Sequence, residues 1–135
     1  MFRSFLLPAV AAVLMAAPPA TEHRSPLRTV QAQTEAFNAH DLEAFAGTFA
    51  EGVEAFAFPS TTQGAKGREA LKRTYAQRFK DHPDLHVSVK DQIVSGAYVI
   101  QRERISGRGA GKPALELVLI YQVENGLISQ FWSIP

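Results

Sequence analysis

The spacing of apolar residues after residue 25 predicts a first helix. Ser25 followed by Pro26 is typical of a helix start, because serine caps the first turn and proline fits the first helical position. The helix is expected to end near Ala39. The residues at helical spacing on its inner face are Leu27, Val30, Thr34 and Phe37.

A second helix is predicted to begin after Asp41, whose side chain can cap it, and to end at Gly52. Its inner face would consist of Leu42, Phe45 and Phe49. His40 lies in the turn between the two helices and is interpreted as a turn or capping residue rather than a catalyst.

The next segment predicts a strand, a loop and a third helix. The strand runs over Val53–Phe58 and ends at Pro59, because proline cannot donate a hydrogen bond within a sheet. A polar loop is expected over residues 60–66. The third helix begins around Gly67 and ends before the His82-Pro83 pair. Its apolar face carries Leu71, Tyr75 and Phe79.

Alternating apolar and polar residues predict long strands over residues 85–93, 97–106, 114–123 and 127–134. Asn125-Gly126 is a strong signal for a tight hairpin before the last strand. His86 alternates with Leu85 and Val87, so its side chain should point away from the apolar side. Such strands twist and can curl around helices. We therefore expect an α+β fold in which three helices pack in a strongly curved antiparallel sheet around an apolar pocket.

Residues 1–20 have a different pattern, which is typical of a secretory signal peptide. Arg3 is followed by the apolar run Phe5–Ala17 and then by small residues and prolines, with cleavage expected after Ala17 or Ala20. The run is shorter than the roughly 20 residues that a spanning helix needs. The sequence predicts a secreted or periplasmic protein without a membrane anchor after cleavage.

The composition of the mature domain excludes several kinds of site and partner. The chain contains no cysteine, which removes disulfides, thiolate metal sites, a lipid-modified cysteine and a thiol nucleophile. Lys and Arg number 14 against 13 Asp and Glu, and no basic stripe with interleaved aromatic residues is present, so no nucleic-acid partner is expected. His82 and His86 are four residues apart, but Pro83 interrupts the helix that would align them. Neither a metal nor a cofactor is predicted.

Three motifs resemble the SnoaL-like branch of the NTF2-like superfamily, which is related to polyketide cyclases and ketosteroid isomerases. They are Asn38–Asp41 at the helix junction, Gly67–Ala70 at the start of the third helix and Asn125–Ile128 in the last hairpin. The resemblance implies a cone-shaped domain over residues 25–135. It does not imply one reaction, because this superfamily includes isomerases, cyclases, dehydratases, hydrolases and non-catalytic domains.

The catalytic groups of ketosteroid isomerase have no counterpart at the matching positions. The position of its basic aspartate falls on Phe58, or on Ala57 in an ungapped comparison. The position of its tyrosine falls near Gln33, and that of its second acid on Leu119. None of these side chains can transfer a proton as the isomerase groups do, so a steroid isomerase is not expected.

The strand over residues 97–106 carries the one candidate catalytic residue, Glu103. One strand face holds Gln101 and Glu103, and the other holds Arg102 and Arg104, so periodicity alone does not identify the inner face. The resemblance to the isomerase strand favours Gln101 and Glu103 inward. A carboxyl group in an apolar lining would have a raised pKa and could act as a general acid or base. The alternative is a surface ion pair between Glu103 and an arginine.

These predictions define a candidate site and leave two classes of function open. The expected pocket residues are Phe58, Tyr75, Phe79, Gln101, Leu117, Leu119, Tyr121, Phe131 and Ser133. An exported enzyme would act on a small, largely apolar molecule through Glu103 by isomerase, cyclase or lyase chemistry. A non-catalytic ligand-binding or dimerisation module would need only the apolar lining. A homodimer is expected through the outer sheet face, which offers Ile100, Val118, Ile120 and Trp132.

Overall fold

The computed structural model of the chain describes residues 23–60 and 63–135. The predicted signal peptide therefore lies outside the described residues. Within these residues the helices are α1 (Pro26–Asn38), α2 (Leu42–Ala46) and α3 (Arg68–Asp81). The strands are β1 (Phe49–Ala57), β2 (Gln63–Lys66), β3 (His86–Ser95), β4 (Tyr98–Ser106), β5 (Leu115–Glu124) and β6 (Leu127–Ile134). None of these helices has the length and apolar character that crossing a membrane requires.

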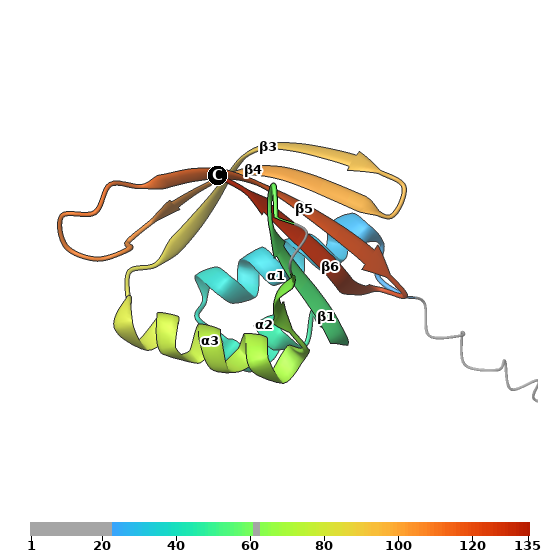
Figure 1. The fold of residues 1–135 in the computed structure, drawn as a ribbon, viewed down its shortest axis with the longest axis horizontal. Coiled ribbons are helices and arrows are strands. Elements are labelled where there is room, and N and C mark those ends of the chain that lie inside the picture. Colours follow the sequence, from blue (N-terminus) through green and yellow to red (C-terminus); the bar gives the residue numbers. More distant parts are fainter. Residues whose placement is uncertain (1–22, 61–62) are drawn as a thin grey trace, which may run out of the picture.

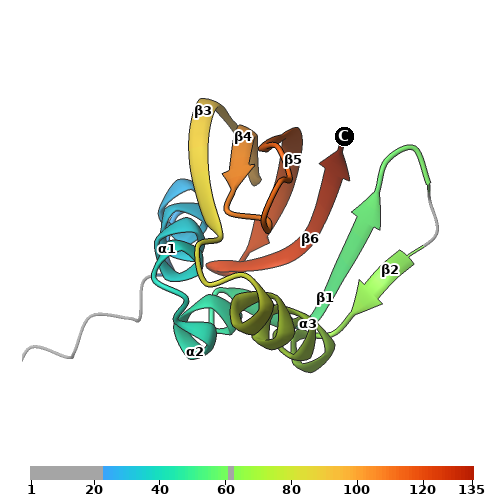
Figure 2. The same ribbon diagram turned by 90° about the vertical axis from the view of Figure 1, so that its left-hand side faces the viewer.

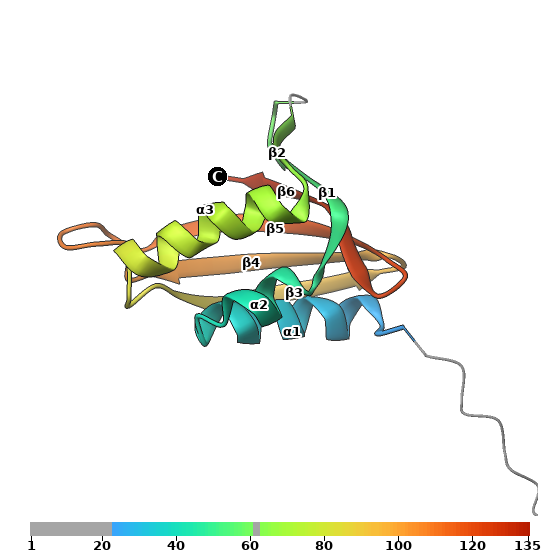
Figure 3. The same ribbon diagram turned by 90° about the horizontal axis from the view of Figure 1, so that it is seen from below.

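The strands form one curved sheet in the order β2-β1-β6-β5-β4-β3. Figures 1 and 2 show the three helices on the concave side of this sheet, and Figure 3 views the domain from that side. The predicted cone of three helices and a strongly curved sheet is confirmed. The sheet is mixed, however, because β1 and β6 pair in parallel while the other neighbours are antiparallel.

The N-terminal ends of the first two helices follow the predicted capping. Ser25 Oγ accepts a hydrogen bond from the Arg28 amide at 3.3 Å, and Pro26 occupies the first helical turn. Asp41 Oδ1 accepts one from the Ala44 amide at 3.0 Å. These contacts satisfy amides that would otherwise lack a partner at the helix ends.

The predicted length of the second helix was wrong. It ends at Ala46 rather than at Gly52, and Phe49 is the first residue of β1. Phe49 lies four residues after Phe45, a spacing that fits a helix, but the chain here is drawn into the sheet by a hydrogen bond of 2.9 Å from the Ile128 amide to the Thr48 carbonyl. Either conformation buries the Phe49 ring, so its spacing could not distinguish them.

The predicted polar loop over residues 60–66 also needed correction. Residues 63–66 form the short edge strand β2, which pairs with β1. Gln63 Nε2 donates a hydrogen bond of 2.6 Å to Glu54 Oε2 across this pair. Edge strands are often short and polar, so the hydrophobic pattern gave no signal for this one.

The helix-junction motif joins the helices to the sheet. Asn38 Nδ2 donates to the Val87 carbonyl at 2.9 Å, and Asn38 Oδ1 accepts from the Val87 amide at 2.8 Å. His40 has a positive φ of 52°, and its Nε2 lies 2.8 Å from the Leu85 carbonyl. Its ring stacks on Phe79 with the centroids 4.6 Å apart. The roles of these two residues are therefore structural.

Aromatic rings fill the space where the helices meet. Phe37 contacts the rings of Phe45, Tyr75 and Phe79 at centroid distances of 5.9, 5.9 and 5.3 Å, all in edge-to-face geometry. Phe45 in turn lies 5.0 Å from Phe49. Such contacts add to the apolar burial that holds the helices together. This cluster fills one part of the concave face and leaves the rest of it open.

The convex face of the sheet carries an apolar row. Strand register places Phe56 beside Trp132, Trp132 beside Ile120 and Ile120 beside Ile100, which crosses β1, β6, β5 and β4. The rings of Phe56 and Trp132 stack with their centroids 5.7 Å apart. In the part of the chain that the structure describes, all three helices lie on the opposite side of the sheet (Figure 2).

Candidate functional site

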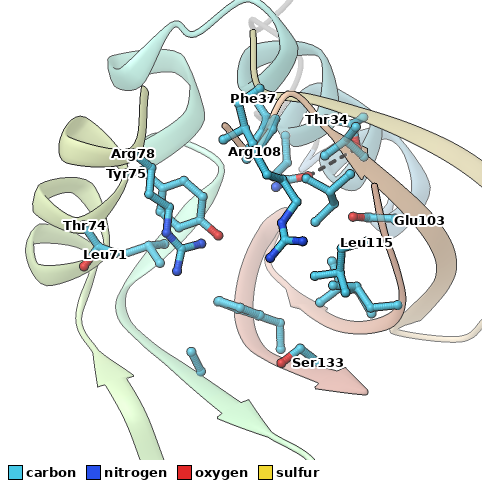
Figure 4. Close-up of a pocket in the computed structure, with 18 of the residues that line it drawn as sticks. Thr34, Phe37, Leu71, Thr74, Tyr75, Arg78, Glu103, Arg108, Leu115 and Ser133 are labelled. Carbon is cyan, nitrogen blue, oxygen red and sulfur yellow. Dashed lines mark hydrogen bonds between the residues drawn. The ribbon is translucent and has the colours of Figure 1, made fainter. Parts of the chain in front are cut away.

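A cavity of about 470 Å³ lies between α1, α3 and the concave face of the sheet (Figure 4). The strand residues on its wall are mostly apolar, and α1 and α3 add both apolar and polar side chains. The apolar lining includes Phe37, Phe49, Leu71, Ile105, Leu115, Leu117, Leu119 and Phe131. The polar lining includes Gln33, Thr34, Thr74, Tyr75, Glu103, Tyr121 and Ser133. A largely apolar space with a few polar groups is typical of a small-molecule site.

Glu103 on β4 is the only acidic residue among the described residues that line this cavity. Its side chain points into the cavity (Figure 4), and the residue is only 2% exposed. The Tyr121 hydroxyl on the neighbouring strand donates a hydrogen bond of 3.2 Å to Glu103 Oε1. Burial raises the pKa of Glu103 to about 7, although the Tyr121 hydrogen bond acts in the opposite direction.

The surface ion pair considered for Glu103 does not form. Arg102 and Arg104 lie on the other face of β4, where Arg102 Nε is 2.6 Å from Asp91 Oδ2 and Arg104 Nη1 is 3.6 Å from Glu116 Oε1. No ion pair to Glu103 occurs within residues 23–60 and 63–135. The carboxyl group therefore faces the cavity without a cation in salt-bridge contact.

Two tyrosines place phenol groups at the same cavity. Tyr121 lies on β5 beside Glu103, and Tyr75 reaches the cavity from α3 (Figure 4). Burial raises the pKa of both phenols, and the nearby Glu103 carboxylate acts in the same direction, whereas the Arg78 guanidinium lowers the pKa of Tyr75. Both groups therefore keep their protons near neutral pH and can donate hydrogen bonds.

Most of the predicted pocket residues come together on the cavity wall. Those are Tyr75, Leu117, Leu119, Tyr121, Phe131 and Ser133, and the candidate catalytic residue Glu103 lies among them. Gln33 and Leu119, two of the three positions compared with ketosteroid isomerase, also line the cavity, and neither carries an acid or a phenol.

Three predicted pocket residues lie elsewhere. Phe58 follows β1 and is 57% exposed, because Ala55 lines the cavity and strand alternation turns Phe58 to the other side. Phe79 belongs to the aromatic cluster between the helices. Gln101 is buried but does not line the cavity, and its Nε2 donates to Gln92 Oε1 at 2.6 Å.

One end of the cavity is basic, which was not predicted from the sequence. This basic end consists of Arg78, His82, Arg108 and Lys112. Arg78 and His82 come from the C-terminal end of α3, and Arg108 and Lys112 come from the loop between β4 and β5. Arg78 lies seven residues after Leu71 and three after Tyr75, so its helical position could have placed it beside the pocket. The β4–β5 loop, which is rich in glycine (Gly107, Gly109 and Gly111), has no regular spacing that could have placed Arg108 or Lys112.

The described residues contain no group of three His, Asp or Glu side chains that could hold a metal ion. His82 lines the cavity, whereas His86 is exposed on β3. The two histidines therefore do not act together at this site.

Comparison with known proteins places the chain in a family. The sequence model of the SnoaL-like domain matches residues 30–131. A search of proteins with curated functions finds no significant match.

Solved structures share the fold at low sequence identity. An uncharacterised cystatin-fold protein from Novosphingobium aromaticivorans is 25% identical with a TM-score of 0.75, covering 83% of this chain and 99% of that one. A provisionally assigned polyketide cyclase from Sinorhizobium meliloti is 20% identical with a TM-score of 0.66, covering 78% and 93%. A provisionally assigned ketosteroid isomerase from Kribbella flavida is 19% identical with a TM-score of 0.67, covering 81% and 76%.

The family match spans most of the domain, and the helices and curved sheet form the NTF2-like cone seen in these structures. The chain therefore belongs to the SnoaL-like domain family, and its fold is the NTF2-like cone.

Proposed function

We propose that this domain binds a small, largely apolar molecule in its cavity and moves a proton on that molecule through Glu103. The observation that supports the proposal most directly is a buried carboxyl group on an apolar cavity wall with no cation paired to it. A carboxyl group with a pKa near 7 is present in both protonation states at neutral pH, so it can accept and return a proton.

The arrangement of the polar groups fits proton transfer at a carbon next to a carbonyl. Glu103 Oε1 accepts from Tyr121, while Oε2 has no hydrogen-bond partner among the described side chains. The carboxylate would take the proton from carbon, and the electron pair of that C–H bond would move toward the carbonyl oxygen as an enolate. Tyr75, across the cavity in Figure 4, could donate a hydrogen bond to that oxygen. In a β,γ-unsaturated ketone the enolate extends over the neighbouring double bond, so return of the proton to the γ-carbon moves the double bond into conjugation and completes an isomerisation.

A non-catalytic binding module is the second candidate. Its support is that Phe58, Gln33 and Leu119 stand at the positions where the isomerase carries its catalytic groups. In that case the cavity would hold its ligand by apolar contact, and Glu103 would only orient a polar group of the ligand.

Exchange of carbon-bound hydrogen for deuterium tests the catalytic proposal without knowledge of the natural substrate. The mature protein is incubated in D₂O with a panel of apolar ketones and enones, and mass spectrometry measures deuterium next to the carbonyl. Native mass spectrometry of the same preparation measures binding.

We expect exchange with at least one bound ketone, loss of exchange in Glu103→Gln, and normal exchange in the control Glu116→Gln. Glu116 is a suitable control because it lies on the convex side of β5 and pairs there with Arg102 and Arg104. Binding without exchange across the panel would favour the binding module. Unchanged exchange in Glu103→Gln would refute the role given to this residue.

A further inference from the structure

The site also has a basic end, and proton transfer through Glu103 does not explain it. Figure 4 shows the guanidinium groups of Arg78 and Arg108 approaching the cavity from opposite sides, one from α3 and one from the β4–β5 loop. Lys112 lines the same region. The cavity lining thus carries three permanent cations and a single carboxyl group, Glu103.

These cations are not neutralised by neighbouring acids. No ion pair to Arg78, Arg108 or Lys112 occurs in the part of the chain that the structure describes. Asp81 lies one helical turn after Arg78, but its Oδ1 accepts a hydrogen bond of 2.8 Å from Gln77 instead. Several cations at one end of a cavity, with no acid paired to them, repel one another, and an anion bound there would relieve this repulsion.

Contacts within the protein hold both arginines near the cavity. The Arg78 guanidinium lies over the Tyr75 ring, with its central carbon 4.9 Å from the ring centroid. Arg108 Nη1 donates a hydrogen bond of 3.3 Å to the Pro113 carbonyl, within the same loop. Each guanidinium has five N–H donors, so most of them stay available for a ligand.

The backbone before Arg108 is also fixed. Gly107 has a φ of +70°, and a Cβ atom at this position would lie 1.9 Å from the Asp84 carbonyl oxygen. Only glycine allows the loop to approach the segment before β3 so closely. The packing of Gly107 against Asp84 therefore fixes the direction of the backbone from which the Arg108 side chain extends.

From this geometry we infer that the ligand is an amphipathic carboxylic acid, with its apolar body against the β4–β6 wall and its carboxylate held between Arg78 and Arg108. Guanidinium groups bind carboxylates through paired, charge-assisted hydrogen bonds. The inference rests on the proposed function in one respect, namely that the cavity takes an apolar molecule. It adds the chemical class of that molecule and the residues that select it.

A matched pair of probes tests this inference by isothermal titration calorimetry. The first probe is 1-naphthaleneacetate, and the second is the neutral 1-naphthaleneacetamide, which has nearly the same shape. The variants are Arg78→Gln, Arg108→Gln and the charge-conserving Arg78→Lys. Arg73→Gln is the control, because Arg73 is exposed on α3 and does not line the cavity.

We expect the carboxylate to bind about tenfold or more tightly than the amide, as one or two charge-assisted hydrogen bonds would give. Arg78→Gln and Arg108→Gln should each remove most of this preference while leaving amide binding unchanged. Arg78→Lys should restore part of it, and Arg73→Gln should behave as wild type. Added salt should weaken carboxylate binding more than amide binding. Circular dichroism melts establish that each variant is folded.

Equal binding of both probes to the wild type would overturn the carboxylate inference and leave an apolar binding cavity in place. A carboxylate preference that survives both glutamine substitutions would overturn the assignment to Arg78 and Arg108. Binding of neither probe would count against the cavity as a site for such apolar molecules, and so against both proposals.

Discussion

Replacing Glu103 by glutamine should change the pH dependence of stability in a defined window. The carboxyl group has an ordinary pKa of 4.5, which burial raises to about 7 in the folded protein. Well below pH 4.5 the group is protonated in both the folded and unfolded states, so its ionisation does not change the free energy of unfolding. Between pH 4.5 and 7 the unfolded chain loses this proton while the folded chain keeps it, so folding becomes less favourable as pH rises.

The size of this effect follows from the two pKa values. Each pH unit within the window is worth about 1.4 kcal/mol in the free energy of unfolding. The full window from 4.5 to 7 therefore amounts to about 3 kcal/mol, reached at and above pH 7. Glutamine has nearly the same shape, its carbonyl oxygen can accept the Tyr121 hydrogen bond, and it does not ionise. Glu103→Gln should thus gain up to about this much relative to wild type at pH 8.

Urea unfolding of wild type and Glu103→Gln at pH 4.5, 5.5, 6.5 and 8 measures this difference directly. The variant should be close to wild type at the lowest pH and progressively more stable above it, while Glu116→Gln should show no such trend. A difference that stays constant from pH 5 to 8 would refute the buried-acid interpretation. An NMR titration of the Glu103 carboxyl with a midpoint at or below its ordinary pKa of 4.5 would refute it as well.

Four further outcomes are expected. Tyr121→Phe removes the hydrogen bond that stabilises the ionised carboxylate, so the Glu103 midpoint in an NMR titration should rise; a lower midpoint would contradict the contact. Asn38→Ala leaves the Val87 amide and carbonyl without their partner and should cost about 1–3 kcal/mol in urea unfolding, whereas an unchanged midpoint would show that the junction does not need this contact. The apolar row on the convex face predicts a homodimer in light scattering at micromolar concentration, with Ile120→Glu shifting it to monomer; a monomeric wild type would exclude this interface. Exported material should begin at residue 18 or 21 by intact mass, and secreted protein that retains residues 1–17 would rule out the predicted cleavage.

The sequence predicted the helices and long strands correctly where the spacing of apolar residues fitted only one kind of element. Strand β6 and the hairpin at Asn125 follow directly from alternation and turn chemistry. Phe49 was assigned to a helix because its ring is buried in either conformation, and only the pairing with β6 decides between them. β2 was missed because its residues carry no hydrophobic pattern.

The candidate site was predictable to the extent that it depends on strand alternation. Alternation together with the family resemblance placed Glu103 among inward residues, and the structure has it there. Phe58 was wrongly assigned to the pocket. The comparison with ketosteroid isomerase matched its position in the sequence and did not consider the face of the sheet to which its side chain points. Arg108 could not be found, since the path of a glycine-rich loop depends on the close approach of Gly107 to Asp84, which is a tertiary contact.

The parallel pairing of β1 with β6 has a consequence for the order of folding. Phe56 lies beside Trp132, 76 residues later, so this side of the cone closes only when distant parts of the chain meet. Contacts of such long sequence separation are slow to form. We expect the β3–β4–β5 meander and its helix contacts to form first and the β1–β6 seam last. The cavity would then be the final part of the domain to take shape during folding.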